Sequence, residues 1–232
     1  LHAWRRLIVL GLLFYAVTQG TTFFGLNYLP AVTVSLLLNF TPLIVALLGG
    51  LLLAERPTPI QWAGIVLNLV GGAIYFATES FPVDRIVALI VVSVGVMANA
   101  GSSVLGRRTN RTGEIPPLVV TVVSMGVGAL VLLVTGILTE GFPRFSLASW
   151  AIIGWLAIAN TALAFTLWNY TLRTLSATES SIINNTMLIQ IAILAWLFLD
   201  ERLTWLKVIG MMLTGLGALI VQLRGKPIRV EK

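Results

Sequence analysis

The chain has no cysteine and a single histidine, His2, and only nine of its 232 residues are Asp or Glu. Without cysteine it cannot form disulfide frameworks, thiolate zinc sites or iron–sulfur clusters. One histidine leaves little imidazole chemistry, so we expect no metal site and no cofactor. Charged residues make up 10% of the chain, whereas a soluble domain carries about a quarter. These residues are too few to cover a water-soluble surface.

Long apolar stretches are what the sequence has instead, because 57% of its residues are hydrophobic. Eight of these stretches approach the roughly twenty residues that cross a bilayer core. They are residues 7–26, 32–54, 60–77, 86–105, 118–138, 150–172, 180–199 and 206–223. The stretches are apolar nearly all round, and proline-containing breaks separate them. The sequence predicts an all-α membrane protein, a multi-span helical bundle whose partner is the lipid bilayer.

The positive charge is concentrated in alternate connections between these stretches. If the chain starts inside, the inner connections hold most of it: Arg5, Arg6, Arg56, Arg107, Arg108, Arg111, Arg173, Arg224, Lys226, Arg229 and Lys232. Cytoplasmic connections carry the excess of Lys and Arg, so both termini are predicted to be cytoplasmic in a plasma-membrane protein. No clustered basic face accompanies the net charge of +6, and we therefore expect no nucleic-acid partner.

An internal repeat covers much of the chain. Without gaps, residues 4–76 align with residues 150–222, and the match includes residue types that apolar composition alone does not supply. The matched pairs are Trp4 with Trp150, Ser35 with Ser181, Asn39 with Asn185, Glu55-Arg56 with Glu201-Arg202, Thr58 with Thr204, Gly64 with Gly210, and Gly71 with Gly217.

The position of the repeat predicts that its two copies are inverted. The first and sixth stretches are equivalent and five crossings separate them, so equivalent helices must run in opposite directions. Inverted repeats are typical of secondary transporters. We expect residues 1–78 to be a partial first repeat with its last three helices, residues 84–223 a complete five-helix repeat, and residues 224–232 a basic cytoplasmic tail. This reading predicts eight spans of an expected ten, with two helices preceding Leu1.

The repeated motif resembles the drug/metabolite transporter superfamily, EamA type. In the first copy a small-residue start at Ala31 leads to a span with Pro42 and leucines that end at Glu55-Arg56, and a Gly-containing span follows. The second copy repeats this from Ala177 to Glu201-Arg202 but has Leu188 in place of the proline. The resemblance implies two inverted five-helix halves, cytoplasmic termini and transport of small organic metabolites, usually outward.

The two Glu-Arg pairs, Glu55-Arg56 and Glu201-Arg202, are the charged groups closest to the spans. Ionisable residues inside membranes are usually functional. Each pair, however, ends a span beside turn residues, where the carboxylate can reach water, basic groups or backbone amides. We interpret them as structural helix-end charges, with coupling or gating as the alternative.

Uncharged polar residues occupy the middle of the spans, and they are the candidates for a substrate cavity. An amide in lipid must find partners, so these side chains should face the bundle interior. For each one, hydrogen bonding between helices is the alternative to lining a cavity, and Asn39 and Asn185 are also candidates for a paired gate or hinge. The candidates are Tyr15, Gln19, Asn39, Asn99, Ser102, Asn160, Trp168, Asn184, Asn185 and Gln190.

The absence of charge in mid-span restricts the function. A phosphate in such a cavity would lack a cationic clamp, and no pair of buried carboxylates is available for intramembrane proteolysis, so no enzyme is expected. We expect a secondary transporter that moves a small neutral, zwitterionic or amphipathic metabolite by alternating access, as an exporter. Uptake, facilitated diffusion or a non-transporting membrane scaffold are the alternatives. Small residues around Gly64 and Gly210 predict close packing within each half, or a homodimer interface.

Overall fold

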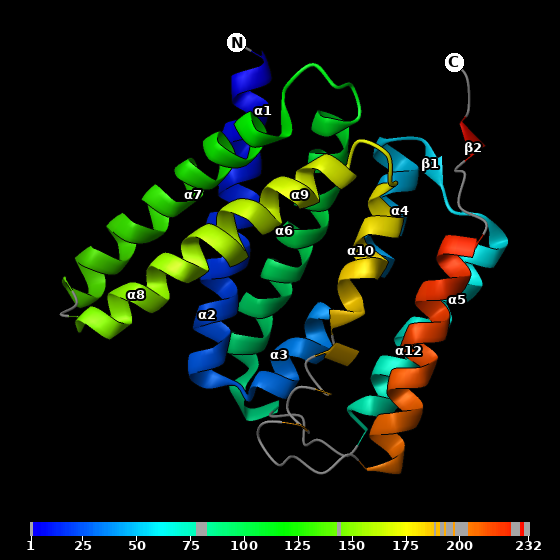
Figure 1. Ribbon diagram of the computed structural model, residues 1–232. Coiled ribbons are helices and arrows are strands. Elements are labelled where there is room, and N and C mark those ends of the chain that lie inside the picture. The colour runs from blue at the N-terminus through cyan, green and yellow to red at the C-terminus, as the bar shows by residue number, and fades with distance from the viewer. Residues whose placement is uncertain are drawn as a thin grey trace.

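The computed structural model describes residues 2–77, 83–142, 145–187, 189–190, 193, 197, 204–223 and 228–229. The described chain is a bundle of helices with one short strand pair (Figure 1). Among the described residues, five helical stretches are long and apolar enough to cross a membrane, and two shorter ones are apolar as well. The multi-span helical fold predicted from composition is confirmed.

The first copy of the repeat forms three helical spans, of which two contain an irregularity. Its elements are α1 (His2–Leu10), η1 (Gly11–Thr18), α2 (Gln19–Tyr28), α3 (Ala31–Leu38), α4 (Thr41–Leu52), β1 (Glu55–Arg56) and α5 (Pro59–Tyr75). Elements α1, η1 and α2 follow one another without a break, and α3 and α4 together form the second span.

The second copy begins with two long helices. Its elements are η2 (Val83–Arg85), α6 (Ile86–Asn110), α7 (Pro117–Glu140), α8 (Leu147–Trp155), η3 (Leu156–Leu163), α9 (Ala164–Thr171), α10 (Ala177–Asn185) and α12 (Trp205–Leu223), followed by β2 (Ile228–Arg229). Helix α6 continues past its predicted end at residue 105, which brings Arg107 inside the helix. In the predicted stretch 180–199, residues 188, 191–192, 194–196 and 198–199 lie outside the described residues, as does most of the tail.

Both copies contain a π-helical segment at the equivalent place. Segment η1 covers Gly11–Thr18 and η3 covers Leu156–Leu163, which coincide within one residue under the repeat alignment. The wider turn is visible at Thr18, whose hydroxyl donates to the carbonyl of Leu13, five residues earlier, at 2.8 Å. Single π turns inside α-helices mark functional sites more often than ordinary helix does.

The second span of the first copy and the equivalent fourth span of the second copy are both interrupted at an asparagine. Helix α3 ends at Leu38 and α4 starts at Thr41, with Asn39 in the intervening turn. Helix α10 ends at the equivalent Asn185, with Thr186 in a turn. Pro42 accounts for a break in the first copy only, because a proline removes a helical hydrogen bond. The second copy breaks without a proline, so the shared asparagine is the common feature.

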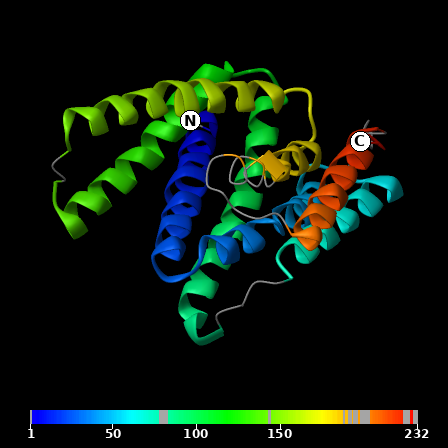
Figure 2. The ribbon, with the colours of Figure 1, turned by 60° about the horizontal axis from the view of Figure 1, so that its bottom comes forward.

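Helices α5 and α12 are equivalent in the repeat, and they pack side by side in both views (Figures 1 and 2). A Cβ on Gly71 would lie 2.7 Å from the carbonyl oxygen of Gly210, and one on Gly217 would lie 2.6 Å from that of Gly64. Early residues of one helix therefore meet late residues of the other, and the pair is antiparallel. Equivalent helices that run in opposite directions are the signature of an inverted repeat.

This pairing corrects the interpretation of the small-residue faces. The sequence assigned them to packing within each half or to a dimer interface. In the structure each face covers the other, across the two copies of one chain. Glycine is required because the two backbones approach too closely for any side chain at these positions.

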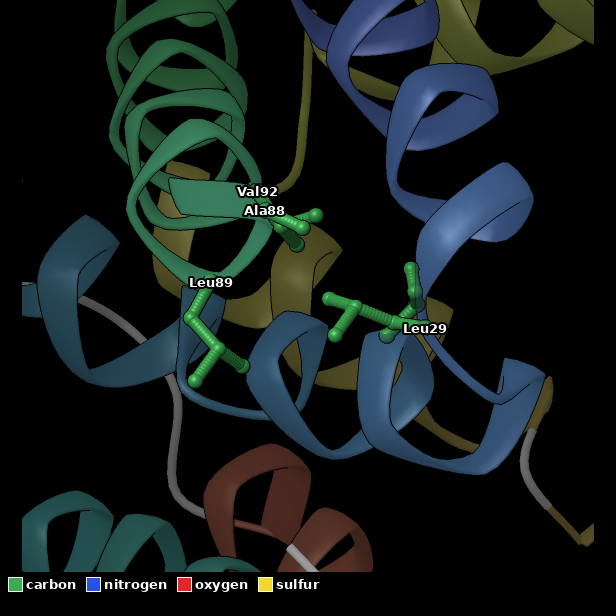
Figure 3. Close-up of a cluster of buried hydrophobic side chains, with 5 residues drawn as sticks. Leu29, Ala88, Leu89 and Val92 are labelled. Carbon is green, nitrogen blue, oxygen red and sulfur yellow. The ribbon is translucent and has the colours of Figure 1, made fainter. Parts of the chain in front are cut away.

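The core is divided into several small apolar clusters. One lies between the α2–α3 connection and the beginning of α6, where Leu29 and Val34 pack on Ala88, Leu89 and Val92 (Figure 3). Large apolar side chains cover the outside of the bundle, including Leu138 and Ile158, which are 80% and 72% exposed. A bundle that carries large apolar side chains on its outside is suited to the hydrocarbon interior of a membrane.

Candidate functional site

A cleft between the first span and helices α6 and α9 is the main candidate site. The cleft is narrow and opens to the outside, and its volume of about 10 Å³ has room for about one water molecule. Uncharged side chains form its walls, from the apolar and aromatic to the hydroxyl and amide types. The lining residues are Leu10, Phe14, Tyr15, Ser102, Ser103, Gly106, Trp168, Asn169 and Leu172.

Aromatic rings from both copies form one side of this cleft. The ring of Phe14 lies 4.9 Å from that of Tyr15 and 5.6 Å from that of Phe165, measured between centroids. Tyr15 and Phe165 are in an edge-on arrangement at 5.3 Å. Such tilted and edge-on contacts are the favourable ones between aromatic rings. They fix the two rings of η1 against α9 and leave a rigid apolar wall.

The polar floor beside these rings is held in place by hydrogen bonds. Asn110 donates to the side-chain oxygen of Asn169 at 2.8 Å, and Asn169 donates to the Thr121 hydroxyl at 3.0 Å. Ser102 and Ser103 both donate to the carbonyl oxygen of Asn99, at 2.7 and 3.0 Å. The floor thus offers hydroxyl and amide groups, which bind neutral polar parts of a solute and give no charge to pair with an anion.

A second polar cluster joins the two helix breaks. Asn185 donates to the side-chain oxygen of Asn39 at 2.8 Å and to that of Asn68 at 3.1 Å. Asn68 in turn donates to the carbonyl oxygen of Thr214 at 3.5 Å. A Cβ on Gly72 would overlap the Asn39 amide, so a glycine makes room for it. Asn39 and Asn185, which the repeat aligns with each other, are thus in direct contact across the boundary between the copies.

The structure brings together only some of the residues predicted to line a cavity. Three of them, Tyr15, Ser102 and Trp168, line the cleft. Gln19 and Asn99 are half-buried near it. Asn184 and Gln190 are exposed and do not line the cleft, while the side chain of Asn160 lies outside the described residues.

Glu55 forms its ion pair with Arg107 and not with Arg56, its neighbour in the sequence. Its carboxylate accepts from Nε of Arg107 at 2.9 Å and from the backbone amide of Ala177 at 3.3 Å. The adjacent Arg56 is exposed. Glu55 thus reaches a basic group and a backbone amide, as expected for a helix-end charge. The equivalent pair Glu201-Arg202 lies outside the described residues.

The sequence interpretation missed several residues of these clusters. Arg107 was assigned to a connection, although no proline or glycine separates it from Asn110 and the helix therefore continues. Phe14 and Ser103 were not singled out either, and Asn68 was interpreted only as part of the small-residue face around Gly64. Their spacing in the sequence could have identified them. They lie four residues after Leu10, Asn99 and Gly64, respectively, and a spacing of four places two residues on the same face of a helix.

The described residues hold no group of three or more His, Asp or Glu side chains arranged for a metal ion. Three features define the class of protein. They are apolar multi-span helices, an antiparallel pair of equivalent helices, and an uncharged cleft between the copies. Together they describe an integral membrane protein built from an inverted repeat.

Comparison with known proteins identifies the family. The model of the EamA-like transporter family matches residues 1–77 and 86–223. The chain therefore belongs to the EamA-like transporter family, and the resemblance drawn from the repeated motif is confirmed. Membership in this family makes the chain a membrane transporter, and the matches point to transporters rather than to enzymes.

Curated relatives agree with this assignment. The "Uncharacterized transporter YyaM" of Bacillus subtilis (strain 168) is 26% identical over 224 residues, which are 91% of this chain and 71% of that protein. Protein PecM of Dickeya dadantii (strain 3937) is 28% identical over 218 residues, or 94% and 73% of the two chains. A solved chain titled "Crystal structure of protein" shares the fold, with a TM-score of 0.77 at 21% identity, and the match covers 95% of this chain and 75% of that one.

Proposed function

We propose that the chain is a secondary transporter that moves a small neutral, zwitterionic or amphipathic metabolite out across the cytoplasmic membrane by alternating access, with both termini in the cytoplasm. The uncharged cleft between the two copies carries the proposal. Rings from Phe14 and Trp168 offer contact to an apolar body, and Ser102, Ser103 and Asn169 offer hydrogen bonds. A few placed polar groups in a mostly apolar pocket are typical of small-molecule sites.

The chemistry of the cleft selects against charged solutes. Among the described residues, no Lys, Arg, Asp or Glu lines the cleft, so a phosphate or a free carboxylate would lose its water without gaining an ionic partner there. Even a neutral polar group costs about 1–3 kcal/mol when it is buried unpaired, and a charge costs more. A zwitterion fits because its opposite charges partly compensate each other.

The arrangement of the copies supports alternating access. The broken spans at Asn39 and Asn185 meet next to the antiparallel α5–α12 pair. Discontinuous helices at the interface of inverted repeats supply binding sites and hinges in other transporters. Exchange of conformation between the two halves would expose the cleft to each side in turn.

Flux into liposomes tests the proposal. Purified protein is reconstituted, and a panel of radiolabelled neutral, zwitterionic and amphipathic metabolites is followed with and without a pH gradient. We expect saturable flux of at least one such solute. Absence of flux for the whole panel would overturn the transport proposal and favour a scaffold, and flux directed only inward would favour uptake.

A pair of tryptophans supplies a matched comparison for the cleft itself. Trp168 lines the cleft, whereas Trp155 on the same span is 71% exposed. Trp168→Ala should lower the flux at least tenfold, and Trp155→Ala should leave it near that of the unmodified protein. Equal flux for the two variants, at equal amounts of folded protein, would mean that the solute passes elsewhere.

A further inference from the structure

A buried ionic network closes one end of the bundle. Arg107 donates from Nε to the Glu55 carboxylate at 2.9 Å and from Nη1 to the carbonyl oxygen of Leu172 at 2.8 Å. The second carboxylate oxygen of Glu55 accepts from the amide of Ala177 at 3.3 Å. We call these four residues the Glu55 network. The side chains of Arg107 and Glu55 are 9% and 10% exposed.

The network connects the two copies of the repeat. Glu55 follows α4 in the first copy. In the second copy Arg107 belongs to α6, Leu172 follows α9, and Ala177 is the first residue of α10. Each of its hydrogen bonds to Glu55 therefore joins one copy to the other. Any movement that separates the copies at this end must break both of them.

The network lies next to the candidate cleft. Leu172 lines the cleft and also accepts the Arg107 hydrogen bond, and Gly106, which precedes Arg107, lines the cleft as well. Below the ion pair, Val45 and Leu53 of the first copy pack on Val104 and Ala177 of the second. The network and this apolar layer therefore join the two copies beside the cleft, at the end of the bundle where the arginines gather, which we call the basic end.

An ion pair suits a contact that opens and closes. A buried apolar contact loses its full stabilisation when it is separated in water. Two charges regain their hydration when they part, so forming a buried pair is close to neutral overall. Removing only one partner is different, because the other charge is then left buried and uncompensated, and the closed arrangement becomes strongly unfavourable.

We propose that the Glu55 network is the latch of the basic end, which holds the two copies together in the closed form and breaks in each transport cycle. The inference rests on the proposed alternating-access function. It assigns to Glu55 and Arg107 a positioning role, since neither side chain needs to touch the solute. The gating alternative for Glu55 is thereby chosen over a purely structural one.

The cysteine-free chain allows a direct test without any solute. Ser103→Cys places one thiol in the cleft of an otherwise thiol-free protein. Its alkylation by a membrane-impermeant maleimide is measured in vesicles whose basic end faces the reagent. In this background Glu55→Gln should raise the alkylation rate at least tenfold, because the uncompensated Arg107 disfavours the closed form.

Arg108 provides the matched control. It is exposed on the same helix, next to Arg107, and Arg108→Gln removes the same charge. Its alkylation rate should equal that of the reporter alone. An unchanged rate in folded Glu55→Gln protein, or an equal rise with Arg108→Gln, would overturn the latch.

A milder variant keeps the test decisive if Glu55→Gln does not fold. Arg107→Lys retains the charge but has no fork to reach both the Glu55 carboxylate and the Leu172 carbonyl. It should give an intermediate rise in the alkylation rate, and no rise would contradict the proposal. Because the assay measures accessibility rather than flux, a protein that moves no solute in the liposome panel overturns the proposed function while the alkylation rates still report on the latch.

Discussion

The glycine contact between α5 and α12 leads to a quantitative prediction for Gly71→Ala. An alanine Cβ at this position would lie 2.5 Å from the backbone nitrogen of Thr214 and 2.7 Å from the carbonyl oxygen of Gly210. Atoms in optimal contact are about 3.5–4.0 Å apart, so the two helices must separate by about 1 Å. Both obstacles are backbone atoms, which cannot rotate out of the way as a side chain can.

The expected destabilisation follows from two opposing contributions. Overpacking of a close contact costs about 1–3 kcal/mol, while replacing glycine by alanine inside a helix gains about 0.5–1 kcal/mol. The central values of these two contributions leave a net loss of about 1 kcal/mol. For a chain of this length it corresponds to a fall of about 2–4 °C in the midpoint of thermal unfolding.

Gly126→Ala is the matched control for this measurement. Gly126 lies inside α7, and a Cβ there would meet no atom within 4 Å. The helix gains from the alanine and nothing is displaced, so the midpoint should stay the same or rise. Both variants are purified in the same detergent and heated at one fixed rate, because membrane proteins often unfold irreversibly. A Gly71→Ala midpoint equal to that of Gly126→Ala would refute the close antiparallel contact.

Three further predictions concern other elements. Asn185→Leu breaks the hydrogen bonds between the helix breaks and should cost about 1–3 kcal/mol in thermal unfolding, whereas exposed Asn184→Leu should leave the midpoint unchanged. Thr58→Ala removes the capping box at the start of α5 and should destabilise the protein by about 1 kcal/mol, and an unchanged midpoint would contradict that role. A single cysteine at exposed Glu114 should react with an impermeant maleimide from the cytoplasmic side, and one at Phe142 only from the opposite side; the reverse pattern would overturn the proposed orientation.

Much of the secondary structure could be predicted from the sequence because lipid imposes a simple rule. Backbone groups inside a bilayer must be satisfied within a helix, so long apolar stretches have one regular conformation available. The predicted stretches 60–77 and 118–138 correspond to α5 and α7. The predicted ends of the helices were less accurate where no proline follows the apolar stretch directly. Arg107 was placed outside α6 for that reason.

The candidate site was only partly predictable. Uncharged polar residues were expected to face inward, and Tyr15, Ser102 and Trp168 do line the cleft. Asn184 was expected to face inward for the same reason, but it is exposed. A polar residue in an apolar stretch carries no information about which helix it faces, because that depends on how the neighbouring helices pack.

The sequence by itself determined that the chain lies in a lipid bilayer, that it contains a repeat, and that the two copies of the repeat are inverted. These follow from the length of apolar stretches, the match of Asn39 with Asn185, and an odd number of crossings, none of which requires knowledge of packing. The tertiary structure alone decided the contacts between the copies: the α5–α12 pair, the hydrogen bonds that join Asn185 to Asn39 and Asn68, and the partnership of Glu55 with Arg107. Residues that are far apart in the chain come together only when helices pack, and side-chain partners are chosen by that packing and not by sequence neighbourhood.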